Sequence, residues 1–309
     1  MESAGHELSH VCFVGAEPLQ PDWRLRPGHR KSLQSSAARA GHGTRLTGAD
    51  ASQTAPPNPL LVWLFQAARL DAGAYRPQAL QRRLLACLRV LRVASPEAAR
   101  ALLEQKPELL PQALSAVLIG VSEFFRDPNV FEQLRQSVLP ELLQGRRGLR
   151  VYSAGCSAGQ ELYSMALLLA ELGVLSTSCL LGIDCRPKAI AQAQAGWFPA
   201  TDLTGVSPKF RQRYFQLTGV RTRVAPALRR QVCWRVGNLL TDSPPGTDWD
   251  VVLCRNVAIY LQPDQTGLWA RLADQLRPGG VLVTGKAERP PAGLPLSRIF
   301  PCIYQRTSN

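Results

Sequence analysis

The sequence lacks several features that would place it in common protein classes. No apolar run approaches the roughly 20 residues that a transmembrane helix needs, and residues 1–20 lack a basic start followed by an apolar block. We therefore expect a cytoplasmic protein without membrane insertion. The eight cysteines show no CxxC pair and no regular spacing, so free buried thiols are expected rather than disulfides or a zinc site.

Histidine is scarce, and all four histidines lie within the first 42 residues. Unless that segment folds back, the core has no histidine to act as a general base or metal ligand, and we expect no metal. Acidic residues are missing from two long stretches, residues 72–96 and 203–241, which hold five and eight basic residues. Such patches attract polyanions or acidic protein surfaces, although each taken singly is explained equally well by a solvated arginine-rich face.

A chain of 309 residues, 45% of them hydrophobic, can form one large domain or two smaller ones. Residues 1–58 mix Gly, Ser, Ala, Arg and Pro without periodicity, so we expect a disordered tail there. Residues 59–119 predict a small helical domain, because apolar residues recur at helical spacing and prolines stand near the helix starts. Its helices are expected at residues 60–70, 77–93, 96–105 and 107–119.

The second of these helices is amphipathic. Four leucines, at positions 80, 84, 88 and 91, share one face, while Arg82 and Arg89 point the opposite way. Its outer face is therefore basic.

From residue 120 onward, strand-like and helical segments alternate. Strands are expected at residues 150–153, 179–183, 232–236, 250–254 and 281–284, with a last one at 298–306; helices at 129–143, 160–172, 187–195 and 263–276; and a turn at 277–280. This alternation predicts an α/β fold with a doubly wound, mostly parallel, Rossmann-like sheet over residues 120–309. Residues 196–231 are longer than a connection needs, so we expect an inserted subdomain there.

Polar or glycine residues follow the predicted strands at the edge where such sheets bind ligands. They are the 154–159 loop, Asp184, Asn238, and Arg255 with Asn256. Each alone is explained by a turn or a helix cap, but together they favour a cofactor that contains adenosine. The loop has glycines at positions 155 and 159 rather than the dinucleotide fingerprint, which disfavours a dehydrogenase.

Four motifs carry a family resemblance. GVSEFFRD (residues 120–127), SAGCSAGQELYS (153–164), GNLL (237–240) and CRNVAIYL (254–261) occur in the order found in CheR-type chemoreceptor methyltransferases. That family uses S-adenosyl-L-methionine to esterify glutamate side chains on chemoreceptor cytoplasmic helices, releasing S-adenosyl-L-homocysteine. The resemblance spans about residues 60–305 and implies a class I methyltransferase sheet, chemoreceptor partners and a role in chemotaxis signalling.

The resemblance also assigns roles by position. It places cofactor contacts on Gly120, Ser122, Arg126, Gln160, Asp184, Asn238, Leu239, Asn256 and Val257. It places Arg126 and Tyr260 beside the reacting methyl group as catalytic residues, against the simpler readings of an ion pair and a packed aromatic. The expected contacts to the acidic receptor are Arg82, Arg89 and Arg255, and the inserted subdomain stands where some relatives dock a receptor tail.

Three positions depart from the family pattern. Glutamate is usual at the position of Gln160, acids flank the position of Cys185 where this chain has Asp184 and Arg186, and asparagine is frequent at Gly120. Gln160 can still form hydrogen bonds, but it lacks the charge that would pair with the cofactor's ammonium group. We therefore expect reduced cofactor affinity.

The absence of histidine does not oppose the implied reaction. A glutamate carboxylate, with an ordinary pKa of about 4.3, is ionised at neutral pH and needs no base to act as a nucleophile. A monomer is expected. The alternatives are a methyltransferase acting on a small molecule or on nucleic acid, and a non-catalytic module that binds S-adenosylmethionine or S-adenosylhomocysteine. Nucleic acid is disfavoured, because the Asp/Asn-Pro-Pro-aromatic motif of amino-methylating enzymes does not stand at residues 255–258.

Overall fold

The computed structural model describes residues 58–308 except 119, 121, 243–245 and 264–266. The expected tail lies outside the described residues apart from Asn58, whose side chain accepts a hydrogen bond from the backbone amide of Leu60 and caps the first helix. No described helix combines the length and the apolar character needed to cross a membrane.

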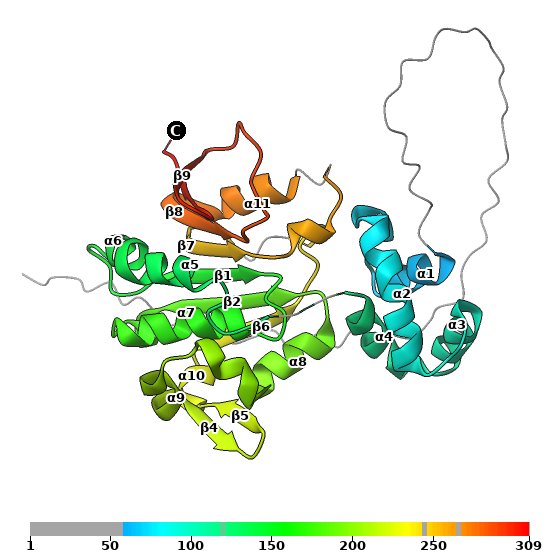
Figure 1. Ribbon diagram of the computed structural model, residues 1–309. Coiled ribbons are helices and arrows are strands. Elements are labelled where there is room, and N and C mark those ends of the chain that lie inside the picture. The colour runs from blue at the N-terminus through cyan, green and yellow to red at the C-terminus, as the bar shows by residue number, and fades with distance from the viewer. Residues whose placement is uncertain (1–57, 119, 121, 243–245, 264–266, 309) are drawn as a thin grey trace, which may run out of the picture.

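The N-terminal helices form a bundle with its own core. They are α1 (Pro59–Ala67), α2 (Pro77–Leu91), α3 (Pro96–Gln105) and α4 (Leu110–Val117), and 3₁₀ turns at Ala72–Ala74 and Pro107–Leu109 precede α2 and α4. Prolines at the first helical positions fit the fixed φ of that residue and replace amides that a helix start leaves unpaired. Leu80, Leu84, Leu88 and Leu91 are buried, as the helical periodicity predicts. In Figure 1 this blue and cyan bundle lies to one side of the sheet.

The rest of the chain builds a seven-stranded sheet in the order β6-β2-β1-β7-β8-β10-β9. Its strands are β1 (Arg150–Ala154), β2 (Cys179–Asp184), β6 (Val232–Val236), β7 (Trp249–Cys254), β8 (Leu276–Thr284), β9 (Leu296–Phe300) and β10 (Ile303–Arg306). Pairs among the first five are parallel, and β10 runs antiparallel to both neighbours. The strand order reverses beside β1, so the predicted doubly wound, mostly parallel sheet is confirmed, with a ligand crevice expected at this switch point.

Helices cover both faces of the sheet (Figure 1). They are α7 (Gln160–Glu171), α8 (Pro187–Ala195), α11 (Gly267–Gln275), and a continuous run of α5 (Pro128–Gln133), a π-helical turn (Leu134–Val138) and α6 (Leu139–Leu142). Val151, Val251 and Leu253 of the central strands are fully buried, as parallel strands covered on both faces should be. Between Gly196 and Gln231 lies a second, antiparallel sheet, β3-β5-β4 (Trp197–Pro199, Arg221–Val224, Phe215–Thr218), with α9 (Pro208–Tyr214) and α10 (Pro226–Arg229).

Two expectations near the C-terminus are wrong. Residues 277–280 do not form a turn before a strand but belong to β8, in a bulge that shifts the register between Trp249 and Val251 and gives Gly279 a φ of +76°. The single last strand expected at 298–306 is a hairpin of β9 and β10, broken at Cys302 with a φ of +66°. In both places proline and a positive φ accommodate a bend that alternating hydrophobicity does not reveal.

Candidate functional site

One cavity of about 260 Å³ opens where the parallel strands end, and the N-terminal bundle forms its opposite wall. The structure brings ten of the predicted site residues to its lining, namely Gly120, Ser122, Arg126, Asp184, Asn238, Leu239, Arg255, Asn256, Val257 and Tyr260. Gln160, Arg82 and Arg89 are not among the lining residues. The roles given to all these residues remain predictions, and their contacts show what each can do.

The turn between β1 and α7 brings backbone close to the opposite side of the cavity. Gly155 has a φ of +78°, and its amide donates to the carbonyl of Ile183 at 2.8 Å. A Cβ atom at this position would lie 2.5 Å from Cγ2 of Val257. Glycine is therefore required here for both conformation and space, and it leaves the cavity open between β1 and β7.

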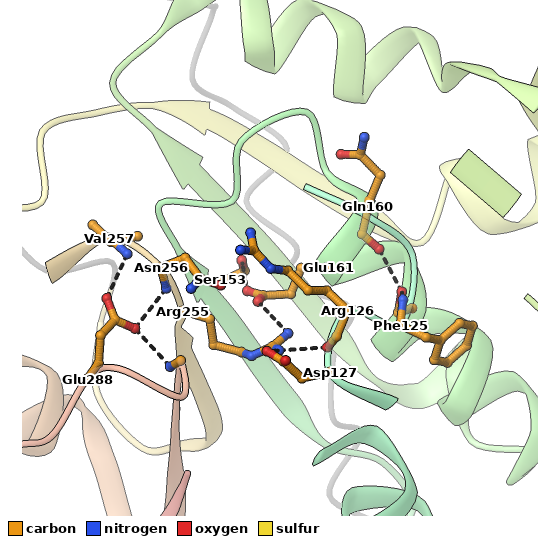
Figure 2. Close-up of polar contacts among 12 residues, drawn as sticks. Phe125, Arg126, Asp127, Ser153, Gln160, Glu161, Arg255, Asn256, Val257 and Glu288 are labelled. Atoms are coloured by element: carbon orange, nitrogen blue, oxygen red, sulfur yellow. Dashed lines mark hydrogen bonds and ion pairs between the residues drawn. The ribbon is translucent and has the colours of Figure 1, made fainter. Parts of the chain in front are cut away.

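Glu161, which the sequence analysis did not single out, presents its carboxylate in the first turn of α7. Its Oε1 accepts from the hydroxyl of Ser153 at 2.9 Å, and its Oε2 lies 3.3 Å from Nη1 of Arg255 (Figure 2). Burial raises the pKa of Glu161, and the nearby Arg255 charge offsets only part of that effect. The side chain lines the cavity, so a buried carboxylate faces the space where a cofactor would lie.

Gln160, the neighbouring residue, is directed elsewhere. Its Nε2 donates to Oδ2 of Asp202, in the 3₁₀ turn Ala200–Gly205 of the inserted segment, at 3.2 Å. Figure 2 shows its amide pointing away from Glu161. Gln160, one of the three departures from the family pattern, therefore lies outside the cavity lining, and the acid at the next position along α7 lines the cavity. The only sequence signal for the role of Glu161 was its place in a pair of adjacent polar residues at a helix start.

The segment before α5 carries Arg126 in a tightly held bend. Phe125 and Asp127 both have left-handed φ values, of +54° and +60°. The amide of Phe125 donates to Oγ of Ser164 on α7, and Nη2 of Arg255 donates to the carbonyl of Arg126 at 2.6 Å. The strained bend is thus fixed from two elements, which places Arg126 at the cavity wall.

Arg255 joins two carboxylates rather than facing solvent. Its side chain is 2% exposed, and Nη2 lies 2.9 Å from Oδ2 of Asp127 while Nη1 contacts Glu161. Burial raises the pKa of Asp127, but the hydrogen bond from Lys286 and the Arg255 charge outweigh it, so that pKa is below its ordinary value. The guanidinium already pairs with two largely buried acids, and the expected contact of Arg255 with the substrate stays a prediction.

The loop after β7 depends on an acid that sequence reasoning missed. Glu288 is buried, and its carboxylate accepts from the amides of Asn256 at 2.7 Å, Val257 at 2.8 Å and Gly285 at 2.8 Å (Figure 2). These bonds fix the turn that leads into the 3₁₀ helix Ala258–Tyr260. The sequence separation of about thirty residues hides this contact, and the pattern gives no signal for it.

The ends of β2 and β6 are hydrogen-bonded within the protein. Both oxygens of Asp184 accept bonds from Arg186, and Oδ2 also accepts from the amide of Ser157. The side chain of Asn238 accepts a hydrogen bond from the amide of Leu240 at 3.0 Å. This bond forms an Asx turn, so a turn-forming role also explains the asparagine. Both residues still line the cavity.

Two basic residues of α2, Arg82 and Arg89, lie outside the cavity. Arg82 and Arg89 are exposed on the outer face of this helix, and Leu85 between them is 62% exposed. A further arginine, Arg76 at the N-cap of α2, reaches the segment after β7, where its Nε donates to the carbonyl of Leu261 at 2.9 Å. The bundle is therefore attached directly to the segment that carries Tyr260.

The lining suits S-adenosylmethionine. The buried Glu161 carboxylate is a partner for an ammonium group, whose positive charge would offset the cost of burying the ionised acid. Leu239 and Val257 offer apolar contact of the kind an adenine ring needs, and the missing Cβ of Gly155 leaves room beside Val257. Glu161, Ser122, Leu239, Asn256 and Val257 are the residues that would hold the cofactor.

Comparison with known proteins shows the family of the chain. The family model described as "CheR methyltransferase, SAM binding domain" matches residues 120–296, more than half of the chain. A chemotaxis protein methyltransferase of Listeria monocytogenes is 31% identical over 242 residues, which is 77% of this chain and 92% of the relative. An uncharacterized 104.1 kDa protein of Rhodobacter capsulatus is 33% identical over 69% of this chain, which spans only 23% of that protein.

Among solved structures, a TehB-like SAM-dependent methyltransferase of Corynebacterium glutamicum aligns with 52% of this chain and 71% of its own, at 19% identity and a TM-score of 0.29. Assignment to a family therefore depends on the sequence matches and not on this alignment. The chain belongs to the CheR methyltransferase family, and residues 120–296 match its S-adenosylmethionine-binding domain.

Proposed function

We propose that this methyltransferase transfers the methyl group of S-adenosylmethionine to glutamate side chains on the cytoplasmic helices of chemoreceptors, forming methyl esters. The observation that carries the proposal is the cavity that gathers Glu161, Arg126 and Tyr260 at the strand ends, with a basic helix beside it. The relative from Listeria monocytogenes is named as a chemotaxis protein methyltransferase, which agrees with this substrate class.

Histidine plays no part in the proposed chemistry, because a glutamate carboxylate is already ionised near neutral pH. The four histidines all lie in residues 1–57, outside the described part of the chain. When bound, the cofactor supplies a methyl group on a positively charged sulfur. Attack by a carboxylate removes both charges, so a site that excludes water favours the reaction over separated, solvated ions.

The protein's own task is alignment. Arg126 and Tyr260 stand on the cavity wall and would orient the incoming carboxylate, the arginine by charge and the tyrosine by a weaker hydrogen bond. Arg255 and Ser164 hold the bend that carries Arg126, and Glu288 holds the loop that leads to Tyr260. Fixing nucleophile and methyl donor in line is the largest contribution such a site can make.

The helix α2 is the proposed receptor contact. It lacks acidic residues, and its exposed Arg82 and Arg89 flank the exposed Leu85 at helical spacing. A glutamate-rich receptor helix would find opposite charge on both sides of an apolar contact, an arrangement that steers encounter and fixes orientation. Because α2 also lines the cavity through Leu80 and Arg83, a helix bound there lies near the site.

The test is incubation of the protein with methyl-tritiated S-adenosylmethionine and a chemoreceptor cytoplasmic fragment, followed by alkali. Carboxyl methyl esters release volatile tritiated methanol, whereas N-methyl groups and methylated nucleic acids keep their label. A matched fragment with alanine at its methylatable glutamates serves as the control. Alkali-stable label, or equal release from the control fragment, would remove the proposed substrate.

A second candidate is a non-catalytic module that binds S-adenosylmethionine or S-adenosylhomocysteine. The observation in its favour is the Arg186 guanidinium on Asp184, a strand-end acid expected to contact the cofactor. Calorimetry that shows cofactor binding together with no label transfer to any receptor fragment would favour this candidate over the enzyme.

A further inference from the structure

Asp184 ends β2 at the place where nucleotide-binding sheets receive ribose hydroxyls, yet its acceptor positions are already filled. Oδ1 accepts from the backbone amide and from Nε of Arg186, both at 2.9 Å. Oδ2 accepts from the amide of Ser157 at 2.9 Å and from Nη2 of Arg186 at 3.2 Å. A carboxylate offers roughly four lone-pair positions, so four bonds leave no capacity for two further hydroxyl donors.

The Arg186 guanidinium is held firmly in this position. Its side chain is 9% exposed and that of Asp184 is 7% exposed, and Nη1 also donates to the carbonyl of Leu118 at 3.3 Å. Moving the guanidinium away to admit hydroxyl groups would separate a buried ion pair, and a neutral hydroxyl is a poor replacement for a charged donor. The favoured state therefore keeps Arg186 on Asp184.

Gly120 makes this arrangement possible. A Cβ atom at position 120 would lie 1.9 Å from Nη1 and 2.2 Å from Nη2 of Arg186. No side chain at that position is compatible with the observed guanidinium, so Gly120 and Arg186 fit each other as a pair. These are two of the positions at which the chain departs from the family pattern, and the structure shows that the two departures are one spatial feature.

We propose that Arg186, admitted by Gly120, is a specificity-determining residue that withholds Asp184 from the ribose hydroxyls of adenosyl ligands. The inference rests on the proposed cofactor site. Ligand binding then depends on the Glu161 end and on the apolar contacts of Leu239 and Val257, and the hydroxyls contribute little. The protein should therefore discriminate only weakly between ribose and deoxyribose. A free Asp184 carboxylate would discriminate strongly between them.

The test is calorimetric binding of S-adenosylhomocysteine and of its 2′-deoxy analogue to the full chain. In the wild type the two Kd values should agree within about threefold, because the lost hydroxyl has no charged acceptor. In Arg186→Ala the analogue should bind about tenfold or more weaker than S-adenosylhomocysteine, since Asp184 can then accept from the hydroxyl. Arg186→Ala combined with Asp184→Asn should return the ratio to the wild-type value.

Gly120→Ala gives an independent route to the same result. Its Cβ must displace the flexible end of Arg186, so discrimination should appear although Arg186 is still present. This variant also decides the question if Arg186→Ala fails to fold. Tenfold discrimination by the wild type, unchanged in Gly120→Ala, would overturn the inference.

The outcomes separate this inference from the proposed function. Binding ratios as expected with no methyl transfer to receptor glutamates would leave Arg186 in its role and remove the proposed substrate. S-adenosylhomocysteine binding that appears only in Arg186→Ala or Gly120→Ala would support the inference. Absence of binding in the wild type and in every variant would overturn it together with the cofactor site.

Discussion

Glu161 presents a buried carboxylate to the cavity, and its neighbour Gln160 does not line it. We predict that Glu161→Gln weakens binding of S-adenosylmethionine by about 10- to 150-fold, the value of a hydrogen bond to a charged group of about 1.5–3 kcal/mol. 5′-Methylthioadenosine, which lacks the ammonium group, should lose little affinity. Gln160→Ala is the matched control and should change both Kd values by less than about threefold. If calorimetry shows a larger loss of S-adenosylmethionine affinity in Gln160→Ala than in Glu161→Gln, Gln160 and not Glu161 binds the ammonium group.

The raised pKa of Glu161 also predicts how binding depends on pH. At pH values between the ordinary pKa of a glutamate and the raised pKa of Glu161, this carboxyl in the folded protein holds a proton that the unfolded chain has released. The Glu161 carboxyl therefore favours the folded state most at low pH, and that contribution declines as the pH rises from the ordinary pKa through the raised pKa. Ammonium binding needs the ionised form, so Kd should rise about tenfold per pH unit as the pH falls below the raised pKa. Glu161→Gln should bind equally weakly across this range; the same slope in both proteins would contradict the assignment.

Arg126 and Tyr260 are predicted to act on turnover. Arg126→Ala and Tyr260→Phe should each lower kcat by about a hundredfold or more, because positioned groups of this kind act in the transition state. The Kd for S-adenosylhomocysteine should change by less than about fivefold, since Glu161 and the apolar wall are intact. Single-turnover transfer and calorimetry measure the two quantities separately. Comparable losses in both would remove the division between catalytic and binding residues.

Individual contacts were the hardest part to predict from the sequence. Resemblance to the family's motifs identified ten lining residues. The meeting of parallel strand ends at one edge of the sheet accounts for four of them, Asp184, Asn238, Arg255 and Asn256. The direction of a side chain within a motif could not be predicted from the sequence. Gln160 contacts Asp202, whereas the adjacent Glu161 lines the cavity. Glu288 was missed because its amide partners are distant in sequence or belong to a turn that no periodicity marks.

At the scale of elements, periodicity predicted most helices and strands, and the failures have a common cause. Proline capping placed the starts of α2, α3 and α8 correctly, and β6 spans the residues expected. The bulge in β8 and the hairpin of β9 and β10 went unrecognised, since both depend on tertiary pairing that keeps a local bend within the sheet.

The outer face of α2 carries the element-scale prediction. Reversing its charge with Arg82→Glu and Arg89→Glu should raise KM for the receptor fragment by about tenfold, most strongly at low ionic strength, because exposed charges act through screened attraction. The kcat at saturating receptor should stay within about twofold of wild type. Arg298→Glu, at an exposed position on β9, makes half of this change in net charge away from α2 and should leave KM unchanged. A salt-independent KM in all proteins would remove α2 as the receptor contact.

Across the whole molecule, the helical bundle and the sheet are joined by backbone as well as by side chains. Tyr75 pairs with Leu261 in an antiparallel bridge, the amide of Arg76 donates to the carbonyl of Tyr260 at 2.9 Å, and the amide of Gln262 donates to Ala74 at 2.9 Å. Arg76 then begins α2, the proposed receptor helix. A partner bound to α2 would therefore be linked through these backbone bonds to the segment that carries Tyr260, a connection that composition and motifs did not indicate.

We predict that this connection makes the bundle and the sheet unfold together. With 5-fluorotryptophan as a ¹⁹F reporter, Trp63 on α1 and Trp249 on β7 should lose their native resonances at the same urea concentration. Arg76→Ala removes the charged hydrogen bond to Leu261, so the bundle should lose about 1.5–3 kcal/mol of stability and the Trp63 resonance should disappear first. Arg82→Ala, an exposed site on the same helix, should leave the two transitions coincident. Separate transitions in the wild type, or coincident ones in Arg76→Ala, would show that the bundle is held to the catalytic segment by other contacts.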